Sequence, residues 1–227
     1  MGQMVEFASN GATCQGYLAV PEGGGPGVIV IQEWWGLVPH IIDLVDRFAA
    51  AGFVALAPDF YRGVATTEPD EAQKLMIGLR VAEAAKDMAG AAAYLVARPD
   101  VTSRAVGAVG FCMGGGLALL AGSVSADIAA TVAFYPGTPW PDYHPDWSAY
   151  TGKDVVIHKA ESDEPHSGPI IAGLTEEITA AGGSVTAFEY PGSLHAFFND
   201  DRPEVYAPEH AAVAWQRTVE LLRADLV

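Results

Sequence analysis

Residues 110–115, Gly-Phe-Cys-Met-Gly-Gly, constrain the fold more than any other part of the chain. Before them, residues 105–109 are small and β-branched, as in a buried parallel strand, and after them residues 117–121 favour a helix. Gly-x-Cys-x-Gly between a strand and a helix is the cysteine form of the nucleophile elbow, in which the glycines allow a sharp turn. Cys112 would then lie at a helix N-terminus, which favours a thiolate. The alternative is a small buried cysteine in a tight turn.

Strands and helices alternate along most of the chain, which predicts an α/β fold with a mostly parallel sheet and helices on both faces. Asn10-Gly11 is a hairpin turn signal and predicts an antiparallel N-terminal hairpin. The expected strands are 4–9, 14–20, 28–31, 53–57, 105–109, 128–134, 154–159 and 185–190. The expected helices are 39–51, 68–97 (one helix, or two with a break near Gly78 or Lys86), 113–122, 169–181 and 203–226.

Composition excludes several classes of function. The chain has 227 residues, half of them hydrophobic, which suits a single domain over residues 1–227. A net charge of −16 disfavours nucleic acid and anionic membrane surfaces as partners. With only Cys14 and Cys112, no disulfide framework is expected, and a free thiol suits the reducing cytoplasm.

A signal peptide would lie at the N-terminus, and a membrane span would need a long uncharged stretch. The N-terminal residues lack a basic region followed by an apolar stretch, so no signal peptide is expected. Residues 105–126 carry no charge and are long enough to span a bilayer, but they contain six glycines and the elbow. A buried strand–turn–helix explains this stretch better.

A nucleophile needs a base, and the base needs an orienting acid. In open α/β sheets, sites form at the carboxyl ends of the strands. Asp163 follows the expected strand 154–159, and His195 follows the expected strand 185–190. The order Cys112, Asp163, His195 is that of an α/β-hydrolase triad, and the alternative reading of His195 is a loop imidazole without a catalytic role.

Other residues could fill the same roles. Glu161 and Glu164 are alternative acids near Asp163. Among the remaining histidines, His166 in an expected loop is the only serious rival base. The others fit less well: His40 opens a helix, His144 lies in a loop, His158 lies inside a strand, and His210 lies on the last helix.

Glu33 ends a strongly apolar strand and is followed by Trp34 and Trp35. Adjacent tryptophans are costly to expose, so the sequence favours a pocket at this strand end over a solvated loop. The backbone N–H groups of Trp34 and Met113 are candidates for an oxyanion hole. The proline- and tryptophan-rich segment 139–147 either lines this pocket or covers the sheet.

The chain resembles the dienelactone hydrolase family, a cysteine branch of the α/β-hydrolases. By that resemblance the fold is the α/β-hydrolase fold, Cys112 is the nucleophile, His195 the base, Asp163 its partner, and Glu33 controls protonation of the thiol. Trp35, Tyr135 and Phe197 are expected to line the substrate pocket. The matching motifs are Gln32-Glu33-Trp34-Trp35-Gly36, Ala57-Pro58-Asp59-Phe60-Tyr61, residues 110–115, Phe134-Tyr135, Asp163, and Tyr190-Pro191-Gly192 leading to His195-Ala196-Phe197.

The sequence departs from the family at the substrate clamp. Family members that act on anionic dienelactone bind its carboxylate with two arginines. Asn199 stands at one of these positions, and residues 66–69, which match the other, include no basic residue. Arg62 and Arg202 are close in sequence and could substitute. The family chemistry therefore carries over better than the family substrate.

These features predict a cofactor-independent hydrolase of small carboxylic esters, lactones or thioesters that works through an acyl-cysteine intermediate. One alternative is a true dienelactone hydrolase (carboxymethylenebutenolidase) of aromatic catabolism. Another is a non-catalytic small-molecule binding protein on the same fold. Neither H-E-x-x-H nor paired Cys/His spacing occurs, so no catalytic metal is predicted.

Overall fold

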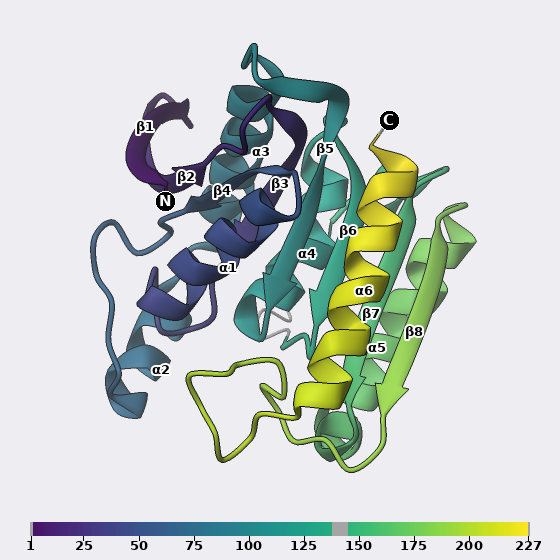
Figure 1. Cartoon of the computed structure of the whole chain (residues 1–227). Coiled ribbons are helices and arrows are strands. Elements are labelled where there is room, and N and C mark those ends of the chain that lie inside the picture. The colour runs from purple at the N-terminus through teal and green to yellow at the C-terminus, as the bar shows by residue number, and fades with distance from the viewer. Residues whose placement is uncertain (1, 138–144, 227) are drawn as a thin grey trace.

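The structure, a computed structural model, describes residues 2–137 and 145–226 (Figure 1). Its eight described strands form one sheet in the order β1-β2-β4-β3-β5-β6-β7-β8. Strands β4 to β8 and β3 are mutually parallel, whereas β1 and β2 form an antiparallel hairpin that joins β4 in antiparallel fashion. The predicted α/β architecture with an N-terminal hairpin is confirmed. The strands are β1 (Gln3–Ser9), β2 (Ala12–Ala19), β3 (Gly25–Ile31), β4 (Val54–Pro58), β5 (Val101–Phe111), β6 (Ile128–Phe134), β7 (Asp154–Ala160) and β8 (Ser184–Tyr190).

Helices cover both faces of the sheet, with α1 and α6 on one face and α3, α4 and α5 on the other (Figure 1). Alternate residues of β3 show why the strand is apolar throughout. Val28 and Val30 pack with α1 and α6, whereas Ile29 and Ile31 pack with α3 and α4. The helices are α1 (Pro39–Ala50), α2 (Pro69–Gly78), α3 (Val81–Val96), α4 (Met113–Val124), α5 (Glu164–Ala180) and α6 (Pro208–Asp225).

Several element boundaries differ from those expected. The expected helix 68–97 is two helices, with the break directly after Gly78. Helix α5 begins at Glu164, five residues before the expected start at Pro169, so that His166 belongs to a helix and not to a loop. The expected start would place Pro169 in the first turn of the helix. In the structure Pro165 lies in the first turn, where a residue without an N–H loses no helical hydrogen bond, and Pro169 lies inside the helix. Helix α6 likewise begins at Pro208 and not at 203.

Most of the uncharged stretch 105–126 is buried, because residues 105–124 form the end of β5, the elbow and α4. Within the ranges 2–137 and 145–226, no helix combines the length and the apolar character needed to cross a membrane. Of the segment 139–147, residues 139–144 lie outside the described residues. Trp147 begins a short 3₁₀ helix, Trp147–Tyr150, which packs beside α4.

The elbow holds Cys112 in a backbone conformation unusual for a side-chain-bearing residue, with φ +56° and ψ −117°. Two glycines make the turn possible by giving space. A Cβ atom on Gly110 would overlap the backbone oxygen of Gly114, and one on Gly114 would overlap the backbone oxygens of Ile31 and Gln32. The elbow is therefore packed directly against the end of β3.

We expect Gly110→Ala to destabilise the protein by roughly 3 kcal/mol, because the added methyl group meets fixed backbone atoms. Gly173→Ala is the matched control, since Gly173 lies exposed in α5 and an added methyl group there would enter open space. It should stabilise by roughly 0.5–1 kcal/mol, the usual gain for alanine over glycine in a helix. Urea unfolding of both variants measures the difference, and equal stabilities would contradict the packing argument.

Candidate active site

Five chemically notable residues follow the carboxyl ends of five neighbouring parallel strands. Glu33 follows β3, Cys112 follows β5, Tyr135 follows β6, Asp163 follows β7 and His195 follows β8. Because these strand ends meet at one edge of the sheet, the residues converge although they span most of the chain. The loops after them lie together at this end of the sheet (Figure 1).

Backbone hydrogen bonds fix the elbow in place. The N–H of Cys112 donates to the carbonyl of Phe134 over 3.0 Å, which ties the elbow to β6. The carbonyl of Cys112 accepts from Gly115 N at 2.9 Å and from Gly137 N at 3.0 Å. The Cys112 side chain stays partly exposed, so a substrate can reach the sulfur.

The structure brings Cys112, His195 and Asp163 together in a continuous hydrogen-bonded line. His195 Nε2 lies 3.1 Å from Cys112 Sγ, and His195 Nδ1 lies 2.7 Å from Asp163 Oδ2. Burial alone would lower the pKa of His195, but its hydrogen bonds to Asp163 and Cys112 outweigh burial and raise that pKa to about 10. The arrangement therefore favours an imidazolium beside Cys112 at neutral pH.

The two alternative acids are engaged elsewhere. Glu161 Oε2 accepts a hydrogen bond of 2.5 Å from the backbone N–H of Gly192. Glu164 Oε2 forms an ion pair of 2.6 Å with Lys159 Nζ. Asp163 is thus the acid that contacts His195, as its position in the sequence indicated.

Ser162 supports the position of His195, a role that the sequence did not predict. Ser162 Oγ accepts a hydrogen bond of 2.9 Å from the backbone N–H of His195, and Ser162 N donates to the Ser193 carbonyl over 3.2 Å. These bonds join the loop that carries the acid to the loop that carries the base. The only signal in the sequence is that Ser162 directly precedes Asp163.

His158 is a satisfied core histidine. It is fully buried in β7, with Nδ1 2.8 Å from the Tyr190 hydroxyl and Nε2 3.1 Å from Thr218 Oγ1. Burial, aided by the nearby charge of Arg217, lowers its pKa to about 3, so the ring stays neutral. His210 lies on α6 and His40 near the start of α1, as expected.

Glu33 is a buried carboxylate with one hydrogen-bonded and one unpaired oxygen. Its exposed fraction is 1 %, and Oε2 accepts a bond of 3.1 Å from Asn199 Nδ2. Oε1 has no hydrogen-bond partner among the residues described, and none of them links Glu33 to Cys112. Burial raises the pKa of Glu33, opposed by the charge of His195 and the bond from Asn199. The sequence indicated only that Asn199 stands where the family has a clamp arginine. The hydrogen bond from Asn199 to Glu33 is visible only in the structure.

The two backbone N–H groups expected to bind an oxyanion are free of backbone acceptors in the described ranges. Met113 is the first residue of α4, so its N–H has no acceptor within the helix. Trp34 lies in the turn after β3, and its N–H donates to no backbone acceptor in the described ranges. Trp34 and Met113 follow the ends of the neighbouring strands β3 and β5.

A cavity of about 460 Å³ opens beside Glu33 and its partner. Trp35, Asn199, Arg202 and Thr66 are among its lining residues. Of the residues expected to line a substrate pocket, Trp35 lines this cavity, whereas Tyr135 and Phe197 are almost fully buried. Cys112 and His195 are not among the residues that line it.

The Tyr135 ring lies between the rings of His195 and Phe197. The centroid of the Tyr135 ring lies 5.1 Å from that of His195 and 5.5 Å from that of Phe197. The contact with His195 is edge-on, which limits the positions open to the imidazole. Among the described atoms, the Tyr135 hydroxyl has no hydrogen-bond partner.

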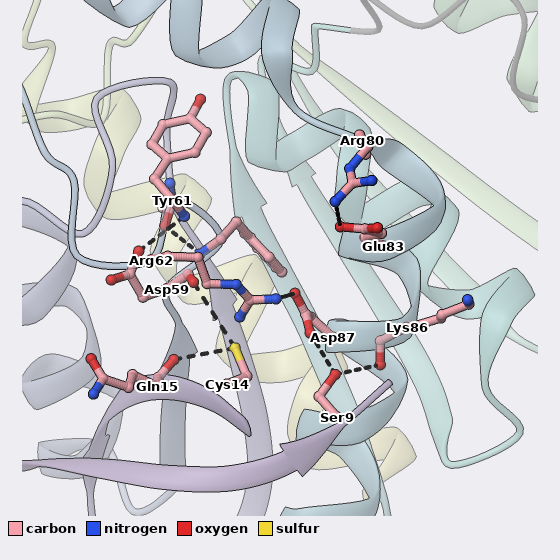
Figure 2. A network of polar contacts seen from close by, with 12 residues as sticks. Ser9, Cys14, Gln15, Asp59, Tyr61, Arg62, Arg80, Glu83, Lys86 and Asp87 are labelled. Carbon is pink, nitrogen blue, oxygen red and sulfur yellow. Dashed lines mark hydrogen bonds and ion pairs between the residues drawn. The ribbon is translucent and has the colours of Figure 1, made fainter. Parts of the chain in front are cut away.

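The structure separates the two arginines considered as substitutes for the family clamp. Arg202 lines the cavity beside Glu33. Arg62 lies in a different polar network, where its guanidinium binds Asp87 Oδ2 at 2.6 Å close to Cys14 (Figure 2). Arg202 is consequently the one of the two that can meet a ligand in this cavity.

Comparisons with known proteins identify similar chains and similar structures. The family model described as "Dienelactone hydrolase family" matches residues 14–226. Protein usf of Aquifex pyrophilus is 37 % identical over 237 residues, covering 100 % of both chains. A provisionally assigned carboxymethylenebutenolidase of Aquifex aeolicus (strain VF5) is 33 % identical, again over 100 % of both chains. The crystal structure of a provisionally assigned dienelactone hydrolase of Klebsiella pneumoniae subsp. pneumoniae superposes with a TM-score of 0.83 at 25 % identity, covering 98 % of this chain and 99 % of the other.

We expect Asp163→Asn to lower the pKa of His195 from about 10 by at least roughly one unit, because the anionic hydrogen-bond acceptor is lost. The His195 ring is protonated below its raised pKa. In the variant the ring should therefore lose its proton at a lower pH than in the wild type. NMR titration of the His195 ring protons measures this. Glu164→Gln is the control and should leave that titration in place, since Glu164 pairs with Lys159. An equal effect of the two substitutions would overturn the assignment of Asp163.

Proposed function

Because the chain belongs to the dienelactone hydrolase family, we propose that it hydrolyses carboxylic esters or lactones through an acyl-cysteine intermediate, without a catalytic cofactor. The observation that carries the proposal is the line from Cys112 Sγ through His195 to Asp163, with separations of 3.1 and 2.7 Å. A nucleophile, a base and an orienting acid within hydrogen-bond reach are what nucleophilic acyl transfer requires. A protein that only binds small molecules has no need of this alignment.

In the first half-reaction, the Cys112 thiolate attacks the carbonyl carbon of the substrate. The carbonyl oxygen becomes an oxyanion, which accepts hydrogen bonds from the N–H groups of Trp34 and Met113. When the tetrahedral intermediate collapses, the carbon–oxygen bond to the leaving group breaks. The leaving alkoxide takes a proton from the His195 imidazolium, and an acyl-cysteine thioester remains.

In the second half-reaction, neutral His195 removes a proton from a water molecule, which attacks the thioester carbonyl. The same oxyanion site stabilises the second tetrahedral intermediate. The carbon–sulfur bond then breaks, which releases the carboxylic acid and restores the Cys112 thiolate beside the imidazolium. Asp163 holds His195 in the orientation that both proton transfers need.

Glu33 is proposed to regulate the ionisation of Cys112. A second negative charge near the thiolate in a water-poor cleft disfavours the ionised sulfur. In the structure Asn199 holds Glu33, while Cys112 contacts His195, which is the arrangement needed for attack. In the resting enzyme, Glu33 would instead accept a hydrogen bond from the neutral thiol, and substrate binding would displace it.

We infer that the substrate occupies the cavity beside Asn199, the partner of Glu33, and the composition of this cavity supports neutral esters or lactones. Asn199 and Thr66 are uncharged, and only Arg202 offers a positive charge in this cavity among the residues described. Arg202 is already paired with Glu204 at 3.0 Å. Dienelactone hydrolysis is the second candidate, favoured by Arg202 and by the provisional carboxymethylenebutenolidase assignment of the Aquifex aeolicus relative.

A substrate panel tests the proposed function. We expect turnover of short nitrophenyl esters and neutral lactones, and dienelactone should not exceed the best neutral ester in kcat/KM by ~10³, because a full carboxylate clamp is missing. A larger preference for dienelactone would favour the second candidate. No turnover of any member would favour a binding protein.

Cysteine variants in the same assays test the nucleophile. Cys112→Ala should remove hydrolysis, whereas Cys14→Ala should retain it. Cys14 is the matched control because it is fully buried in β2, and burial, together with the charge of Asp87, raises its pKa to about 11. Near-normal activity of Cys112→Ala would show that another group attacks the substrate.

The proposed regulation by Glu33 makes an independent prediction. Glu33→Gln removes the like charge, so Cys112 should react faster with iodoacetamide near neutral pH while ester hydrolysis falls. Mass spectrometry of the alkylated peptide identifies Cys112 as the modified residue. Alkylation at an unchanged or lower rate would mean that Glu33 does not suppress the thiolate.

A further inference from the structure

A second cluster of chemically reactive side chains lies outside the Cys112–His195–Asp163 line. It consists of His40, the second residue of α1, and of Asp200 and Asp201 in the loop between β8 and α6. One ligand-type atom from each residue lies within 4.8 Å of the other two. We propose that these three residues bind one divalent transition-metal ion of the zinc class.

Unpaired buried atoms point to a ligand at this place. His40 is 3 % exposed, yet neither ring nitrogen has a hydrogen-bond partner in the described part of the protein. Oδ1 of Asp200 is also buried without a partner there. Buried polar atoms are almost always paired, so a group without a protein partner usually binds an ion or an ordered water molecule.

The spacing of the atoms suits a metal better than a direct hydrogen bond. His40 Nδ1 and Asp200 Oδ1 lie 3.4 Å apart without forming a hydrogen bond. Two ligands of a tetrahedral zinc, each about 2.0–2.1 Å from the metal, lie about 3.4 Å apart. Asp201 is exposed, so rotation of its side chain can bring a carboxylate oxygen to the same centre.

Neighbouring charges orient the site and favour a cation. Arg47 Nη2 binds Asp200 Oδ2 and Asp43 Oδ2, each at 2.5 Å, which leaves Asp200 Oδ1 directed to His40. Outer partners of this kind typically orient metal ligands. Three carboxylates (Asp43, Asp200 and Asp201) and one guanidinium (Arg47) give a local charge of −2.

The donor set indicates the class of metal. One imidazole nitrogen and two carboxylate oxygens suit zinc and similar transition metals, whereas calcium and magnesium prefer oxygen ligands alone. His40 and Asp201 also line the cavity of about 460 Å³, so water or a small ligand can fill the remaining coordination positions. His40 and Asp200 are far apart in sequence, which is why no metal motif is visible there.

Metal binding would stiffen the segment that holds Glu33. Asn199, which donates to Glu33, also accepts a hydrogen bond of 3.1 Å from Asp201 N. A metal that joins the 199–202 segment to α1 therefore fixes the partner of Glu33. This consequence rests on the proposed role of Glu33, whereas metal binding itself does not.

Calorimetric titration with ZnCl₂ after chelator treatment tests the proposal. The titration uses Cys112→Ala protein, because the Cys112–His195 pair could itself bind zinc. We expect one zinc per chain, a rise in Tm on zinc addition, and no comparable binding of MgCl₂. Absence of zinc binding to this protein would overturn the proposal.

Two further substitutions in that background separate ligation from charge. Asp201→Asn should raise the Kd by about 100-fold or more, since a ligand is lost. Asp43→Asn removes the same charge outside the ligand set and should raise the Kd by about threefold or less, as exposed charges contribute little. Equal losses in the two variants would show attraction by surface charge alone and would overturn the site.

The imidazole ligand is tested with His40→Gln, which keeps a side chain of similar size. Loss of the visible absorption of bound Co²⁺ in this variant, with circular dichroism unchanged, supports ligation by His40. If His40→Gln does not fold, the comparison of Asp201→Asn with Asp43→Asn still decides the proposal, because both changed side chains are exposed.

Discussion

The active site depends on the close packing of the elbow against the end of β3. Cys112 has a positive φ of +56°, a conformation that costs an ordinary residue roughly 1–3 kcal/mol. Contacts of Gly114 with the backbone of Ile31 and Gln32 hold the turn in place. The same contact sets Cys112 beside the strand end that carries Glu33. The geometry of Cys112, the proposed nucleophile, thus comes from backbone packing and not from its own side chain.

The position of His195 depends on contacts between the loop after β7 and the loop after β8. Asp163 orients the His195 ring, while Ser162 binds the His195 backbone. Glu161 accepts a hydrogen bond from the backbone N–H of Gly192, so this alternative acid supports the loop that carries His195. A base held at both its ring and its backbone loses little entropy when it transfers a proton, which is the benefit of a preorganised site.

Opposing charges meet at the edge of the sheet. In the proposed mechanism, the helix N-terminus and the His195 imidazolium favour the Cys112 thiolate, whereas the buried carboxylate of Glu33 disfavours it. Asn199 binds that carboxylate and, through Asp201, connects it to the His40 cluster. In a chain of net charge −16, these hydrogen bonds link the buried Glu33 to the cluster that we propose as a cation site.

The sequence by itself determined the alternation of strands and helices, the elbow and the order of Cys112, Asp163 and His195, because periodicity and turn chemistry are local properties. It misplaced the start of α5, since Pro165 and Pro169 are both compatible with a first turn until packing chooses between them. The tertiary structure alone decided that Asn199 binds Glu33, that Arg202 and not Arg62 lines the cavity, and that His40 lies beside Asp200. These contacts join residues far apart in the chain, so only the packing of distant loops against one sheet edge could fix them.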